Sequence, residues 1–118
     1  NKIDGNFEKY DESILENNLI KLEKNELVYS MYATPALSAI NENYENLYIN
    51  QSFCKIIPNS KILDIKYLNF YFDKNRNNFI KLASGTTQKN LNTIIIKNFI
   101  INTPPLKLQN SLISIIGV

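Results

Sequence analysis

The segment Ser84-Gly-Thr-Thr-Gln-Lys-Asn90 brings together side chains that could bind nucleic acid. It presents hydroxyl, amide and cationic groups in consecutive positions: Thr86, Thr87, Gln88, Lys89 and Asn90. Hydroxyls, backbone amides and a lysine can hold phosphate, and a neighbouring glutamine can reach the bases. Alternatively, Thr86 or Thr87 closes a turn together with Asn90 and caps a helical turn over residues 93–97. Gly85 is the expected pivot of this loop.

A second group of candidates lies on an expected strand over residues 27–32 and on the turn that follows it. The candidates are Ser30, Tyr32 and Thr34. Side chains alternate along a strand, so Ser30 and Tyr32 share one face, while Tyr29 and Met31 share the other. Either the turn reaches DNA, or the tyrosines pack in the core or on the sheet surface.

Two further polar segments each have two interpretations. Lys74, Arg76, Asn77 and Asn78 form either a clamp on the DNA backbone or the polar face of a helix. Asn50-Gln51 either contacts DNA or supplies a buried asparagine that ties down one end of a sheet.

The charge of the chain is unevenly distributed. Residues 1–26 carry seven acids and four lysines, a balance of −3, and residues 27–54 carry two acids and no cation. Residues 55–118 carry nine lysines and arginines against two acids, a balance of +7. A local excess of this size attracts a phosphate backbone, although a solvated lysine-rich surface has the same composition.

The composition excludes several kinds of catalytic site. The chain has no histidine, which excludes Ser-His-Asp and Cys-His catalysis and histidine-ligated metals. Cys54 is the single cysteine, so no internal disulfide or multi-cysteine metal site can form, and we expect a buried strand thiol. Asn102-Thr-Pro-Pro-Leu106 differs from the catalytic loop of amino-methyltransferases, and three glycines provide no cofactor loop. We expect no enzymatic activity, no cofactor and no metal.

The pattern of apolar residues predicts an α+β fold, a twisted mixed or antiparallel sheet flanked by short helices and ending in the start of a long helix. The expected elements are strands over 27–32, 37–40, 47–49, 52–57 and 99–101, a helix capped by Asp64, a helical turn over 93–97 and a final helix with an apolar stripe of Leu108, Leu112 and Ile115. Residues 14–22 form a short helix or a helix–strand pair. We expect a cytoplasmic fragment, because the chain opens with Asn1 and shows no signal peptide or membrane span.

Four segments in this order resemble target recognition domains of type I restriction-modification specificity subunits. They are Leu27–Ile40, Tyr48–Pro58, Tyr67–Asn92 and Asn98–Gln109. The first is similar to the family pattern "dllfSMYasvGkvaI", the second to "iNQaf.gi.p", the third to a helix followed by "aSGstqknl", and the fourth to "l.iplPPleeQ". The chain departs from the pattern at Ala36-Leu37, where the family usually has Gly-Lys.

The resemblance implies sequence-specific binding of double-stranded DNA, with methylation and cleavage performed by separate modification and restriction subunits. It implies the C-terminal part of one recognition domain over residues 1–105 and the start of a spacer helix over 106–118. Two alternatives stay open: a protein-interaction module that no longer reads DNA, and the recognition segment of a fused restriction–methylation enzyme.

Overall fold

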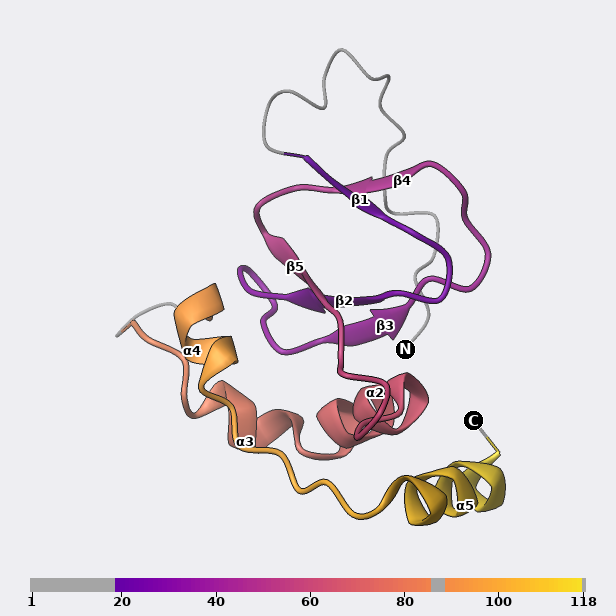
Figure 1. Cartoon of the computed structure of the whole chain (residues 1–118). Coiled ribbons are helices and arrows are strands. Elements are labelled where there is room, and N and C mark those ends of the chain that lie inside the picture. Colours follow the sequence, from indigo (N-terminus) through magenta and orange to yellow (C-terminus); the bar gives the residue numbers. More distant parts are fainter. Residues whose placement is uncertain (1–18, 86–88, 118) are drawn as a thin grey trace.

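The computed structural model describes residues 19–85 and 89–117. It has three layers: a two-stranded sheet, a three-stranded sheet below it, and helices on the far side of the larger sheet (Figure 1). This arrangement confirms the α+β class that the sequence predicts.

The described strands are β1 (Ile20–Leu22), β2 (Leu27–Ser30), β3 (Ser38–Ile40), β4 (Leu47–Ile49) and β5 (Phe53–Ile56). Every described pair is antiparallel. The strands divide into two sheets: β4 pairs with β1 in the smaller sheet, and β2 lies between β3 and β5 in the larger one. The alternation of apolar residues gives the strands but does not specify which strands pair.

Strand β2 is buried on both faces. Leu27 and Tyr29 belong to the core shared with the helices, whereas Val28 packs with Leu22 and Leu47 against the small sheet. All four residues of β2 are therefore buried, although side chains alternate between the two faces. The strand is also hydrogen-bonded along both edges, so its position is tightly determined.

Helix α2 (Ile65–Lys74) begins where the sequence predicts. One carboxylate oxygen of Asp64 accepts the backbone N–H groups of Lys66 and Tyr67 at 2.9 and 3.0 Å. Its buried residues include Leu68 and Phe72, which cover the larger sheet. The helix ends at Asn75, and α3 (Arg76–Ile80) follows at once, so the Asn-rich segment breaks the helix.

Helix α4 (Thr93–Lys97) confirms the predicted helical turn, but its cap is Asn92, whose side chain accepts the N–H of Ile95 at 2.8 Å. The strand expected over residues 99–101 is not formed. Instead, the ring of Phe99 packs against those of Phe79 and Tyr29, with centroids 4.4 and 6.0 Å apart. Phe99 therefore packs between α3 and β2 instead of pairing in a sheet, and the neighbouring Ile100 is 90% exposed.

Helix α5 (Leu106–Ile116) begins near the predicted position and is eleven residues long. Its buried residues are Gln109 and Ile113, so the predicted stripe is displaced, and Leu108 and Ile115 are exposed. Gln109 is fully buried, and its amide joins the start of α5 to the backbone just before α2. Its oxygen accepts from Asp64 N at 2.8 Å, and its Nε2 donates to the carbonyls of Ile62 and Pro104 at 2.8 and 2.7 Å.

Cys54 is buried in β5, as the sequence predicts. Burial in apolar surroundings raises the pKa of its thiol to about 11, because the thiolate loses its hydration. The thiol therefore packs as a small apolar side chain at neutral pH.

Gln109→Ala should lower the free energy of unfolding by about 2–3 kcal/mol, because a fully buried side chain and its three partly buried hydrogen bonds to the backbone are lost. Urea denaturation of the chain measures this change. Asn110→Ala, at an exposed position on the same helix, should change the free energy by less than about 0.5 kcal/mol. Equal effects of the two substitutions would contradict the role of Gln109.

Candidate nucleic-acid interface

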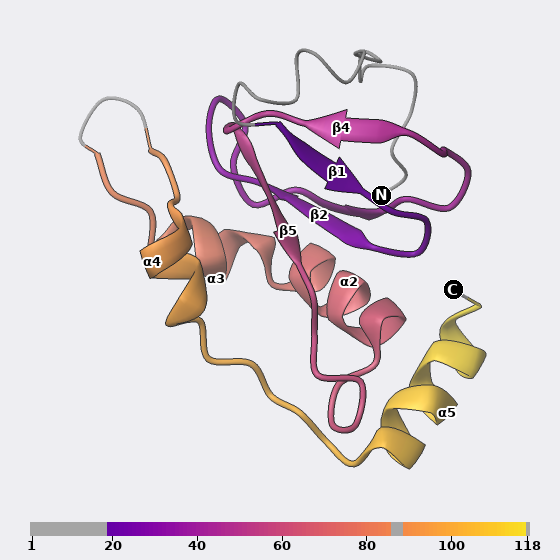
Figure 2. The same cartoon turned by 45° about the horizontal axis from the view of Figure 1, so that its top comes forward.

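Three connecting segments meet at one end of the molecule, which we call the loop end. It comprises the β2–β3 turn (residues 31–37), the β4–β5 turn (residues 50–52) and residues 84–85 and 89–90. Met31 N donates to Ser52 O at 2.8 Å, which joins the β2–β3 turn to the β4–β5 turn. Leu91 N donates to Met31 O at 2.9 Å, which joins the β2–β3 turn to the residue that follows Asn90. Figures 1 and 2 show the loop end on the left, beside α3 and α4.

The β2–β3 turn is organised around the side chain of Ser30. Its hydroxyl donates to Thr34 O at 2.7 Å and accepts the N–H of Leu37 at 2.9 Å. Ser30 is 5% exposed, so the structure assigns its hydroxyl to the interior of the turn. Tyr32 and Thr34, the other two candidates of this segment, are exposed at the tip.

Two alanines of this turn have left-handed backbone conformations. Ala33 has φ 61° and Ala36 has φ 65°, values that cost an alanine roughly 1–2 kcal/mol each. Ala36 stands where the family pattern has glycine, and its positive φ gives the physical reason for that glycine. The turn keeps this conformation here without glycine, because the surrounding contacts determine it.

Arg76 reaches the same turn from the start of α3. Its Nη2 donates to Pro35 O at 3.0 Å, and its Nε is buried. The cation also lies close enough to Tyr29 to act on its phenol. Burial and the neighbouring Cys54 raise the pKa of Tyr29 well above its ordinary value, and the Arg76 charge offsets part of this rise. Lys74, by contrast, is exposed, with its ammonium 5.7 Å from the centre of the Phe70 ring.

The two ends of the Ser84–Asn90 loop are hydrogen-bonded to each other. Ser84 and Asn90 exchange two backbone hydrogen bonds of 2.9 Å, and Gly85 has φ 116°, which agrees with its expected role as a pivot. Lys89 is exposed. The side-chain oxygen of Asn90 is buried with no hydrogen-bond partner within the described chain. Thr86, Thr87 and Gln88 lie outside the described residues.

The β4–β5 turn contributes two exposed amides to the loop end. Asn50 uses its side-chain oxygen locally, accepting the N–H of Ser52 at 2.8 Å, while Gln51 is exposed. The interpretation of Asn50 as a buried tie of the sheet end is therefore wrong. That role belongs to Asn41, which is fully buried and bonds Leu22, Glu23 and Tyr44. The alternation of apolar and polar residues in the sequence does not show that Asn41 is buried and Asn50 is exposed.

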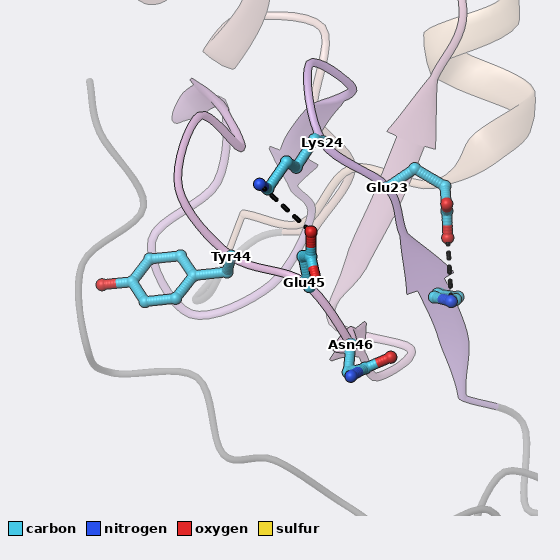
Figure 3. Close-up of a pocket in the computed structure, with 6 residues that line it drawn as sticks. Glu23, Lys24, Tyr44, Glu45 and Asn46 are labelled. Atoms are coloured by element: carbon cyan, nitrogen blue, oxygen red, sulfur yellow. Dashed lines mark ion pairs between the residues drawn. The ribbon is translucent and has the colours of Figure 1, made fainter.

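The opposite end of the molecule is built from acidic connections. Four glutamates lie in the β1–β2 turn and the β3–β4 connection: Glu23, Glu26, Glu42 and Glu45. A hollow of about 230 Å³ lies there, and Figure 3 shows ion pairs across its lining. Lys24 pairs with Glu45 at 3.3 Å and Lys21 with Glu23 at 3.2 Å, so these charges neutralise one another.

The segment that contains α3, the loop and α4 has the opposite balance. Between residues 73 and 97 the chain carries five cations and one acid, a balance of +4: Lys74, Arg76, Lys81, Lys89 and Lys97 against Asp73. Among the described residues, α3 and α4 lie on the side of the loop end (Figure 1), and the four glutamates of the two connections lie at the other end.

Residues 19–85 and 89–117 contain no cluster of three or more cysteine, aspartate or glutamate residues that could hold a metal ion. Within the same ranges, no helix has the length and apolar character needed to cross a bilayer.

The comparison with known families covers nearly the whole chain. Residues 2–116 match the family described as the type I restriction modification DNA specificity domain. The matched region includes both sheets, all described helices and the loop end. It also includes the four segments that carry the resemblance in the sequence. This chain belongs to the family of type I restriction modification DNA specificity domains.

Proposed function

We propose that the chain binds double-stranded DNA in a sequence-specific manner and that the loop end is the surface that contacts the duplex. The observation that carries the proposal is the convergence of three polar connections at the cationic end of a DNA specificity domain. Four of the six acids in the described residues lie at the other end, where lysines pair with three of them.

The proposed contacts fall into two classes. Lys89 is exposed beside the loop and is suited to phosphate, as is Lys74 on the adjoining helix end. Phosphate contacts fix the position of the protein on the duplex and carry little sequence information. Gln51 and Gln88 are the proposed readers of base edges, because an amide can accept from and donate to adenine at the same time. Tyr32 and Thr34 are exposed at the tip of the β2–β3 turn, which also belongs to the loop end.

Catalysis is proposed to reside in partner proteins. In this account the chain supplies recognition, while methylation and cleavage belong to modification and restriction subunits of a type I complex. The family match supports the recognition role. We further propose that residues 1–105 form the C-terminal part of one recognition domain and that α5 belongs to the start of a spacer helix.

One observation favours a second function. The family pattern has a lysine after the turn glycine, and this chain has Leu37, which is 40% exposed. An exposed leucine in the same turn as the exposed Tyr32 is better suited to a protein surface than to phosphate. A protein-interaction module that no longer reads DNA is therefore the alternative, and the two experiments below separate it from the leading proposal.

Lys89→Ala should weaken binding to all DNA sequences alike, because the ammonium neutralises one phosphate. The slope of log K against log salt should become shallower by about 0.9. Competition binding of the protein that carries this chain, at its natural length, measures this at several salt concentrations. Lys24→Ala is the matched control, since its cation pairs with Glu45 at the opposite end and should leave the slope unchanged. Identical slopes for both variants and the parent would remove Lys89 from the interface.

Gln51→Ala should reduce discrimination between sequences rather than overall affinity. A bidentate amide contact contributes roughly 1–3 kcal/mol against the wrong base. The test uses a duplex selected by the parent protein from a random pool, together with all single-base variants of that duplex. Preference should relax at one base pair. Asn43→Ala, exposed on the acidic end, is the control. An unchanged preference at every position would exclude base reading by Gln51.

A further inference from the structure

Arg76 has the charge expected of a phosphate contact but not the geometry of one. Its Nη2 donates to the carbonyl of Pro35 at 3.0 Å, and its Nε is buried. The residue is only partly exposed, in contrast to Lys74, two positions earlier. The guanidinium is therefore directed toward the protein, and at least one of its donors is already used.

The contact falls in the part of the β2–β3 turn that has left-handed backbone conformations. Pro35 lies between Ala33 and Ala36, the two alanines with positive φ. A turn that holds two such residues without glycine needs external contacts to keep its conformation. Two side chains supply them on successive carbonyls, the Ser30 hydroxyl on Thr34 O and the Arg76 guanidinium on Pro35 O.

We propose that Arg76 is a positioning residue of the DNA surface: it fixes the β2–β3 turn, and with it the exposed tip at Tyr32 and Thr34, and does not itself neutralise a phosphate. The proposal rests on the proposed function for its effect on DNA, but its effect on the turn is independent of DNA. Loss of Arg76 should therefore change which sequence is bound rather than how strongly salt opposes binding.

The first test measures DNA binding by the protein at its natural length, with the parent-selected duplex and a scrambled duplex over a range of salt. Arg76→Ala should reduce the preference for the selected duplex about tenfold while leaving the salt slope at the parent value. Lys74→Ala removes the same charge from an exposed side chain and leaves the Pro35 contact in place, so the preference should be retained. Arg76→Lys should restore part of the preference, since lysine can still donate to a carbonyl.

A salt slope that falls by about 0.9 in Arg76→Ala, with preference unchanged, would overturn the proposal in favour of a direct phosphate contact. Ser30→Ala provides a second variant that alters the turn without altering charge. It should reproduce the loss of preference at an unchanged slope. A preference equal to that of the parent in both Arg76→Ala and Ser30→Ala would also overturn it.

The second test needs no DNA and separates this proposal from the proposed function. Hydrogen exchange of the Ala36 and Leu37 amides reports directly on the turn, because both N–H groups are bonded to Ser30. Arg76→Ala should accelerate their exchange about tenfold, and Lys74→Ala should not. Unchanged exchange in Arg76→Ala would contradict positioning even if the parent binds DNA. Accelerated exchange in a protein that binds no DNA would overturn only the proposed function.

Discussion

The burial of β2 on every side is the constraint from which the rest of the structure follows. Its edges pair with β3 and β5, one face packs on α2, and the other face packs on the small sheet. A strand held in this way cannot slip, since a shift of one residue would exchange the contents of the two cores. Its last residue, Ser30, therefore delivers the following turn to a fixed position, where its own hydroxyl closes that turn.

In the proposed function, the exposed cations near the loop end attract the phosphates of DNA and bring the β2–β3 turn close to the duplex. At the acidic end, glutamates are paired with nearby lysines, including a 3.0 Å contact between Lys55 and Glu26. At the loop end, Lys89 is exposed and Arg76 faces inward. In the proposed function, a few surface cations supply affinity, and a rigid framework of turns supplies the geometry needed for reading bases.

Local patterns in the sequence predicted local structure well, as the Asp64 cap of α2 and the helical turn at Thr93–Lys97 illustrate. The predictions failed where contacts between residues far apart in the sequence determine the structure. Phe99 lies in an apolar run typical of a strand, yet its ring packs against Phe79 and no strand forms over residues 99–101. Two of the candidate residues, Ser30 and Arg76, make inward contacts at the loop end, and no spacing rule in the sequence reveals such contacts.

Site-specific cross-linking tests the central claim, that the loop end faces DNA, most directly. A photoreactive phenylalanine analogue replaces either Tyr32, exposed at the tip of the β2–β3 turn, or Tyr44, on the hollow at the opposite end (Figure 3). Each protein, at its natural length, is irradiated with the duplex selected by the parent. We expect a cross-link from position 32 and none from position 44. Cross-linking from position 44 alone, or equally from both positions, would contradict the account.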